Sequence, residues 1–456
     1  MKQFDDTVLG EEKIGKLLLK LSIPATIAMM VNAIYNLVDA IYIARGVGTD
    51  AIGGLALAFP VQMLIMAFGG LLGMGAASVI SRSLGANNRE RATTAAANTI
   101  GLSAALGLVV AALGLIFIDP LIRLLGASDV LHGYAKDYLS VILIGSVFLT
   151  IAMVSSGLIR AEGQAKVSMR IMIIGAGLNI ILDPIFIFVF KLGIAGAAWA
   201  TTISQFVSFL YVVSFYARGG SVMRIKKANL IPQWSVLREI FALGVPAFIR
   251  QGGMSILMVV VNNTLGAYGG DIYISAYGVV NRLFMFMLMP LFGVVQGFQP
   301  ITGYNYGARK PDRVKTTVKL SMLSLSVYGT FATLLLLVLP GFFVSLFTPD
   351  PALIATAKSI LRIIVLMFPL IGVQIIGAGF FQAIGKPIPA LILGMSRQYF
   401  LLIPMVLILP IFFGINGVIA SFPISDTIAT IITVSWLLRE MKKLHLIGTP
   451  VELETE

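Results

Sequence analysis

The sequence predicts an all-α, polytopic membrane protein with twelve transmembrane helices. Hydrophobic residues make up 58% of the 456, charged residues only 12%, and the mean hydropathy is +0.94. A soluble domain of this length does not show such values. The apolar runs are long enough for helices, which need about 20 residues to cross a membrane, and too long for barrel strands of about ten residues. The expected fold is therefore an α-helical bundle.

Twelve apolar runs follow one another along the chain. The predicted spans are 18–44, 52–81, 92–118, 134–160, 167–190, 194–217, 238–268, 272–303, 316–346, 352–384, 387–409 and 415–438. No short signal peptide with a cleavage site precedes the first run, so we expect that run to be retained and to act as its own insertion signal.

The second half of the chain repeats the first at an offset of 222 residues. Pro246 matches Pro24, and Gly385 matches Gly163. Each half has six spans, an even number, so both halves keep the same orientation. We expect two six-helix bundles related by a pseudo-two-fold axis along the membrane normal, with a central cleft. The predicted parts are an N-terminal lobe (1–217), a basic linker (218–237) and a C-terminal lobe with its tail (238–456).

Positive charge is concentrated on one side of the predicted membrane. Of the 33 Lys and Arg residues, 24 fall on the N-terminal segment, alternate connections and the C-terminal tail, six fall on the opposite side, and three fall within spans. The positive-inside rule then predicts a multi-pass protein of the cell membrane with both termini cytoplasmic. The net charge of +12 therefore indicates a lipid bilayer as partner and no nucleic acid.

Polar residues on three helices are predicted to share one layer in the outer part of the N-terminal lobe. Asp39, Asp183 and Thr201 lie roughly 8 to 11 Å below the outer ends of their spans, and Asn179 lies one turn deeper on the same face as Asp183. A carboxylate inside a span costs about 2.5 to 3.5 kcal/mol on insertion scales, so both aspartates require a functional reason. Carboxylate, amide and hydroxyl oxygens suit Na⁺, and two close carboxylates equally suit a shared proton.

The neutral polar residues of this layer have a second interpretation. Asn179, Thr201 and Thr202 could simply tie neighbouring helices together by hydrogen bonds. We also consider four residues as candidates for substrate contact. They are Tyr35, Asn36, Met153 and Thr202.

The C-terminal lobe carries its own intramembrane charges. Asp426 lies in the middle of the last span, with Arg282 and Arg397 at comparable depth and Arg250 deeper toward the cytoplasm. A buried Asp–Arg pair reduces the insertion cost of each partner. A structural role for Asp426 is therefore favoured over a coupling role.

The chain resembles the multidrug and toxic compound extrusion (MATE) family over nearly its whole length. The resemblance rests on twelve spans in two repeats, on Asp39 in the first span, and on the paired turns Gly85-Ala86 and Gly307-Ala308. It is similar above all to the prokaryotic DinF-like and MepA-like branches. This likeness implies that the first helix can bend at Pro24. It also implies a cation-coupling site in the N-terminal lobe, formed by Asp39, Asn179, Asp183 and Thr201.

One departure limits the likeness to other branches. Within the seventh span, residues 240–268 include no acidic residue, whereas the NorM-like and eukaryotic branches use one there. The resemblance therefore argues against a coupling site of their kind in the C-terminal lobe.

We expect a monomeric secondary antiporter that exports organic, cationic and amphipathic compounds in exchange for H⁺ or Na⁺ by alternating access. No phosphate loop, metal cluster or nucleophile constellation indicates an enzyme, and the absence of cysteine excludes disulfides and thiolate sites. No cofactor beyond the coupling ion is expected.

The main alternative is a lipid-linked oligosaccharide flippase of the wider superfamily, which predicts a cation-rich cleft. A scaffold or receptor does not explain the intramembrane acids. A major-facilitator carrier would show an Asp-Arg motif where this chain has Gly85-Ala86-Asn87-Asn88-Arg89.

Overall fold

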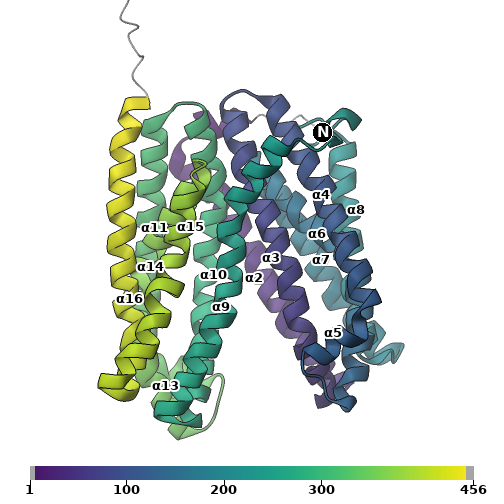
Figure 1. Cartoon of the computed structure of the whole chain (residues 1–456), viewed down its shortest axis with the longest axis vertical. Helices are drawn as coiled ribbons and strands as arrows, with labels where there is room; N and C mark the ends of the chain where they lie inside the picture. The colour runs from purple at the N-terminus through teal and green to yellow at the C-terminus, as the bar shows by residue number, and fades with distance from the viewer. Residues whose placement is uncertain (1–5, 448–456) are drawn as a thin grey trace, which may run out of the picture. The chain divides into compact units, whose positions relative to one another are not determined.

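The computed structural model describes residues 6–447, and these fold into helices without strands (Figure 1). The all-α prediction is confirmed, and each predicted span coincides with helical structure. The predicted tail after residue 447 lies outside the described residues.

The first half of the chain supplies one helix for each predicted span, with short helices between them. The elements are α1 (Val8–Glu11), α2 (Ile14–Gly46), α3 (Thr49–Gly85), α4 (Arg89–Ile116), α5 (Ile118–Leu124), α6 (Asp129–Ala161), α7 (Ala165–Pro184), the π-helical turn η1 (Ile185–Val189), α8 (Gly193–Ala217) and the 3-10 turn η2 (Lys227–Leu230).

The second half follows the same order. Its elements are α9 (Trp234–Gly269), α10 (Asp271–Gly307), α11 (Pro311–Val338), α12 (Pro340–Ser345), α13 (Pro351–Ile364), the 3-10 turn η3 (Val365–Met367), α14 (Phe368–Ala383), α15 (Pro387–Met395), the π-helical turn η4 (Ser396–Leu402) and α16 (Ile403–Ile447).

Within the described residues, eleven helical stretches are long and apolar enough to cross a membrane. The last of them, Pro387–Leu444, contains both of the final predicted spans. These spans meet at Gly414, whose φ of 55° and ψ of −141° interrupt α16. A side chain is disfavoured at such a φ, so glycine allows the break between the two spans.

The internal repeat is visible in the backbone. Helices α3 and α10 both have 37 residues, and α4 and α11 both have 28. The chain leaves α3 through a left-handed residue, Asn87 (φ 57°), and leaves α10 through Arg309 (φ 54°), which is 222 positions later. Gly163 (φ 92°) and Gly385 (φ 83°) have the same relationship. Equivalent turns therefore end equivalent helices in the two halves.

The described chain forms two compact units, which exchange short segments. Unit 1 holds residues up to Glu11 together with Ile23–Gly244, and unit 2 holds Glu12–Ser22 together with residues from Val245 onward. The chain crosses between the units three times. The first crossing lies between α1 and α2, and the other two lie inside α2 and α9, next to Pro24 and Pro246. Each half of the chain thus begins with a helical segment that packs in the unit formed mainly by the other half.

The segment predicted as a linker, 218–237, lies within unit 1. Asn98 of α4 fixes part of it, because its amide nitrogen donates to the carbonyls of Asn229 (2.7 Å) and Ile231 (3.0 Å). Its Oδ1 accepts from the backbone of Gln233 at 2.7 Å. Polar side chains of α4 therefore make the predicted connector part of the packed unit.

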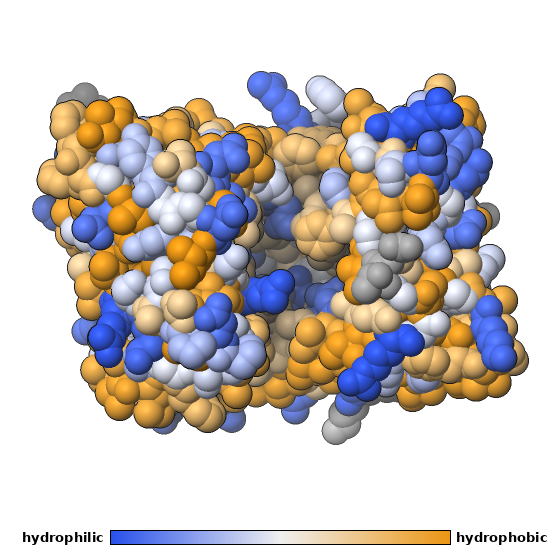
Figure 2. Space-filling view, turned by 90° about the horizontal axis from the view of Figure 1, so that it is seen from below, coloured by the Kyte–Doolittle hydropathy of each residue, from blue (hydrophilic) through white to orange (hydrophobic). Residues whose placement is uncertain are grey.

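The fourth long helix of each half is the centre of its unit. In unit 1, α6 packs against α3, α4 and α8. In an apolar stretch of 18 residues, 72% of the residues of α6 are buried, compared with 17% in α4. In unit 2 the corresponding stretch, α13 to α14, is 56% buried by the same measure. Hydrophobic residues lie around the sides of each unit and hydrophilic residues gather on its end face (Figure 2). This distribution is what a bilayer requires of a spanning protein.

Candidate functional site

Three helices of unit 1 bring the four predicted coupling residues together. Asp39 comes from α2, Asn179 and Asp183 from α7, and Thr201 from α8, and all four are at most 6% exposed. The amide nitrogen of Asn179 donates to Asp183 Oδ1 at 3.2 Å and to Thr201 Oγ1 at 3.1 Å. The carboxyl groups of Asp39 and Asp183 lie within hydrogen-bonding reach of each other. We call these four residues the carboxylate site.

The end of α2 docks on the turn that follows Asp183. The ring of Tyr42 meets the ring of Phe188 edge to face, with centroids 6.2 Å apart. One helical turn later, a Cβ at Gly46 would overlap the side chain of Ile187, so glycine permits the close approach. Ile43 is fully buried in one hydrophobic cluster with Ile187. Because Asp39 lies one helical turn before Ile43, this docking sets the position of the Asp39 carboxyl group.

Asp183 is the penultimate residue of α7, just before a local change in helical geometry. Pro184 follows it, and the chain then widens into the π-helical turn η1, in which the amide of Phe190 donates to the carbonyl of Ile185 at 2.9 Å. Single π-helical turns inside α-helices occur frequently at functional sites. Here the turn that follows the carboxylate of α7 is itself the segment on which α2 docks.

Three buried oxygen atoms of the carboxylate site have no hydrogen-bond partner among the described residues. They are Asp39 Oδ1, Asn179 Oδ1 and Asp183 Oδ2. An unsatisfied buried acceptor costs about 1 to 3 kcal/mol, and more when it is charged. A proton or a hard monovalent cation would satisfy these oxygens, because all are acceptors of the type that such cations bind. The donor set therefore fits either coupling ion.

The surroundings of the carboxylate site include residues that sequence analysis missed. Tyr138 of α6, 2% exposed, is close enough to interact electrostatically with both carboxyl groups. Its hydroxyl accepts a hydrogen bond from Gln62 of α3 at 3.1 Å. Gln62 is an isolated polar residue in an apolar stretch, and this could have drawn attention to it.

The candidates for substrate contact occupy different environments. Tyr35 interacts electrostatically with both carboxyl groups of the carboxylate site. Asn36 is exposed, and its amide donates to the carbonyl of Asn32 at 2.7 Å. Thr202 is buried and donates to the carbonyl of Val141 at 3.1 Å, which ties α8 to α6. Met153 is half-buried on α6, where its sulfur faces Gly69 of α3.

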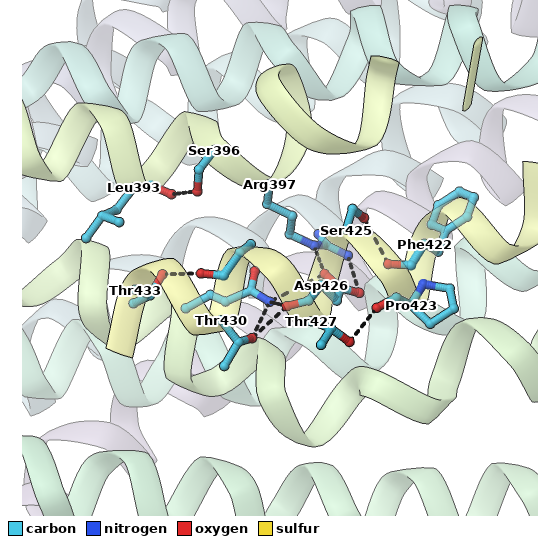
Figure 3. Close-up of polar contacts among 12 residues, drawn as sticks. Leu393, Ser396, Arg397, Phe422, Pro423, Ser425, Asp426, Thr427, Thr430 and Thr433 are labelled. Carbon is cyan, nitrogen blue, oxygen red and sulfur yellow. Dashed lines mark hydrogen bonds and ion pairs between the residues drawn. The ribbon is translucent and has the colours of Figure 1, made fainter. Parts of the chain in front are cut away.

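Unit 2 contains the predicted Asp–Arg pair (Figure 3). Arg397 Nε donates to Asp426 Oδ1, and Arg397 Nη2 donates to Oδ2 at 3.3 Å. Gln374 supports the pair by donating to the Asp426 carbonyl at 2.9 Å and to Thr430 Oγ1 at 3.0 Å. The predicted Asp–Arg pair is thus present: the buried Asp426 pairs with the half-buried Arg397, which lies in the π-helical turn η4.

The two other intramembrane arginines lie elsewhere in the second half. Arg282 on α10 is exposed, and Arg250 on α9 is half-buried. The described structure gives neither of them an ion pair with Asp426.

Comparison with known proteins gives one consistent result. Residues 24–185 and 246–408 each match the family model described as MatE, so that the two matches begin at Pro24 and Pro246. The chain is 31% identical over 418 residues to the multidrug export protein MepA of Staphylococcus haemolyticus, which covers 92% of each protein.

Solved structures agree with these matches. A MATE protein in a bent conformation has a TM-score of 0.92 and 28% identity, with 98% of this chain and 100% of that chain covered. A MATE protein in a straight conformation has the same TM-score and identity, with 97% and 100% covered.

Proposed function

Because the chain belongs to the MatE family of multidrug transporters, we propose that it exports cationic, amphipathic organic compounds in exchange for H⁺ or Na⁺. It is a multidrug efflux transporter of the plasma membrane and not an enzyme. The proposal concerns the coupling ion, the class of substrate, the residues that carry the coupling, and the orientation in the membrane.

One observation supports the choice of the coupling site. Asp39 and Asp183 place two carboxyl groups side by side in a buried, polar layer, with acceptor oxygens that no residue of the described chain satisfies. Two charged carboxylates this close repel each other, and both lose hydration on burial. A bound cation or proton relieves both costs. Asn179 holds the second carboxylate in place by donating a hydrogen bond to it, and the same amide nitrogen also donates to Thr201.

Exchange requires that the coupling ion and the substrate disfavour each other. In our proposal, ion binding neutralises the carboxylate site, and α2 then bends at Pro24. The bend moves Tyr35 and Asn36, which lie between Pro24 and Asp39, and so reduces the space for substrate. Release of the ion to the cytoplasm restores that space. By thermodynamic linkage, the bound ion weakens substrate binding by the same factor by which bound substrate weakens ion binding.

The proposed orientation follows from charge. The basic connections, including Arg218 and Arg224, lie on the cytoplasmic side together with both termini. The repeat of six helices in each half builds both units within one chain, so we propose that a monomer is the functional form.

The flippase alternative is not favoured. It requires free cations for an anionic lipid-linked substrate, and Arg397 is already paired with Asp426. The relatives that match over most of the chain are multidrug exporters.

Reconstitution in liposomes tests the proposal. Purified protein is loaded into vesicles with an imposed proton gradient or, separately, an imposed sodium gradient, and the movement of a fluorescent organic cation is followed. We expect movement with one of the two gradients. The matched control is the Asp39→Asn/Asp183→Asn double variant. If neither the proton gradient nor the sodium gradient drives movement of the fluorescent cation, the antiporter mechanism is contradicted.

A further inference from the structure

Unit 1 contains a cavity at the opposite end from the carboxylate site. Its volume is about 570 Å³, within the range of about 300 to 1,000 Å³ that is usual for ligand sites. Its walls come from Ile100 of α4, from Ile151 and Ser155 of α6, and from one face of α8. That face consists of Phe209, Val212, Val213, Tyr216 and Ala217, and the end is closed by Gly219, Ser221, Met223, Arg224 and Ile225. Most of these side chains are apolar.

The cavity has the depth of one membrane leaflet. Ile151 lies ten residues before the end of α6 and Phe209 lies eight before the end of α8, or roughly 15 and 12 Å at about 1.5 Å per residue. One leaflet supplies about half of the 30 Å of hydrocarbon. The cavity also reaches the lipid-facing surface, because Val213 both lines it and is 46% exposed.

Two polar groups in the cavity are unsatisfied. Ser155 is fully buried, and its hydroxyl oxygen has no hydrogen-bond partner among the described residues. The same holds for the hydroxyl of Tyr216, which lies one residue before the end of α8. A purely apolar occupant would leave both hydroxyls unpaired, at a cost of about 1 to 3 kcal/mol each. An occupant with ester or phosphate oxygens could pair with them.

The mouth of the cavity is basic. Arg224 lines it and is exposed, and Arg218 and Lys226 nearby are also exposed. None of these three cations belongs to an ion pair among the described residues. The acid beside them, Glu162, is fully buried and is occupied by hydrogen bonds from Ser221 (2.8 Å) and the Val222 amide (3.0 Å). The charge at this mouth therefore favours an anion and disfavours an organic cation.

We propose that this cavity binds one anionic phospholipid. One acyl chain lies between α4, α6 and α8. The ester oxygens accept hydrogen bonds from the hydroxyls of Ser155 and Tyr216, and the headgroup phosphate lies at Arg224. The apolar walls, the depth, the lipid-facing opening and the basic mouth each match one part of such a lipid. The site is separate from the carboxylate site and does not depend on the coupling ion.

Quenching by brominated lipids tests the proposal. The three natural tryptophans, Trp199, Trp234 and Trp436, are replaced by phenylalanine, and Phe209→Trp then reports from inside the cavity. The protein is placed in phosphatidylcholine vesicles with a fixed fraction of either dibrominated phosphatidylglycerol or dibrominated phosphatidylcholine. We expect a preference for phosphatidylglycerol of about fivefold, comparable with the effect of one basic residue near an anionic surface.

Two controls make the result specific. Leu210→Trp lies at the same depth on α8, is 46% exposed and does not line the cavity, so both lipids should quench it alike. Arg224→Gln in the Phe209→Trp protein should remove the preference. Equal quenching of Phe209→Trp by both lipids, or no quenching, would overturn the proposal.

A second measurement avoids tryptophan replacement. The unmodified protein and its Arg224→Gln variant are purified in detergent, stripped of lipid and titrated with phosphatidylglycerol, and bound lipid is counted by native mass spectrometry. We expect one tightly retained lipid in the unmodified protein, and its loss in the variant. Equal retention in both proteins would contradict the assignment of the headgroup.

Discussion

Asp39 of α2 and Asp183 of α7 hold their carboxyl groups within hydrogen-bonding reach of each other in the interior of unit 1. They share one layer with Asn179 and Thr201, and each of the two carboxyl groups has an oxygen without a hydrogen-bond partner among the described residues. Two acids in this arrangement titrate or bind a cation as a pair and not as independent groups.

The first prediction concerns this pair. Asp39→Asn and Asp183→Asn each imitate a permanently neutral carboxyl group, and each should abolish gradient-driven efflux while leaving a folded protein. The double variant should be scarcely worse than either single variant, because the pair acts as one unit. Asn179→Ala should cause a smaller loss, since it removes a neutral partner. Wild-type efflux by Asp39→Asn, with unchanged dependence on pH and sodium, would show that the mechanism is wrong.

The second prediction concerns the pair in unit 2. Asp426→Asn should leave the half-buried Arg397 without its counter-ion. Breaking a fully buried pair typically costs about 3 to 5 kcal/mol, and a smaller loss is expected here. Thermal unfolding in detergent should therefore occur at a lower temperature, while efflux per folded molecule stays close to wild type. Adding Arg397→Gln should recover part of the stability. A stable Asp426→Asn protein without transport would instead assign the pair a coupling role.

The third prediction is a pH dependence of stability at the end of α6. Burial raises the pKa of Glu162 to about 8, although its hydrogen bonds from Ser221 and Val222 act to lower it. The folded state thus keeps a proton that the unfolded chain releases above its ordinary value of 4.5. Stability should fall as the pH rises from about 4.5 to about 8 and level off above that. The glutamate Oε1, which has no partner among the described residues, is free to carry this proton.

Glu162→Gln provides the comparison for this effect. Glutamine keeps an acceptor for Ser221 and Val222 but does not titrate, so its thermal stability should vary less between pH 5 and pH 8 (a range that lies roughly between the two pKa values). Parallel pH profiles for the two proteins would exclude Glu162 as the source.

The fourth prediction concerns Pro24. A proline inside a helix removes a backbone hydrogen bond and allows a bend. Pro24→Ala should favour the straight form of α2 and slow gradient-driven efflux, with little loss of expression. Pro246→Ala, at the equivalent position of α9, is the matched comparison and should have the smaller effect. Equal effects of the two changes would mean that bending is not specific to the first helix.

The fifth prediction tests orientation. Ala228 is exposed in the segment that follows α8, and the chain has no natural cysteine. Ala228→Cys should resist an impermeant thiol reagent in intact cells and react after lysis. Reaction in intact cells would reverse the proposed topology.

Sequence analysis predicted the helices and the polar layer because both depend on local quantities. Hydropathy determines which runs can span a membrane, and helical rise places Asp39, Asp183 and Thr201 at one depth. The rotation of each helix about its own axis is determined by packing against other helices and not by local sequence. The proximity of the Asp39 and Asp183 carboxyl groups depends on the packing of Tyr42 against Phe188 and on the π-helical turn after Pro184.

The missed features have the same origin. Arg282 and Arg397 were equal candidates for Asp426 by depth, and only the packing of unit 2 selects Arg397. Tyr138 and Gln62 meet across α6 and α3, which no spacing in the sequence reveals. The segment 218–237 reads as a connector by composition, yet the side chains of Asn98 and Glu162 fix it in unit 1.

The exchange of helical segments at Ser22 and Gly244 has a consequence for biosynthesis. Unit 1 needs residues up to Gly244, where Arg82 of α3 pairs with Glu239 at 2.8 Å, and so it cannot be completed by the first half of the chain alone. Unit 2 needs the segment Glu12–Ser22, whose Glu12 carbonyl accepts from Arg313 at 2.7 Å, and this segment is translated long before the rest of unit 2. If the gene were divided between the repeats, each product would lack part of its own core and would carry part of the other's. The two half-proteins should therefore be degraded when made separately and rescue each other when made together.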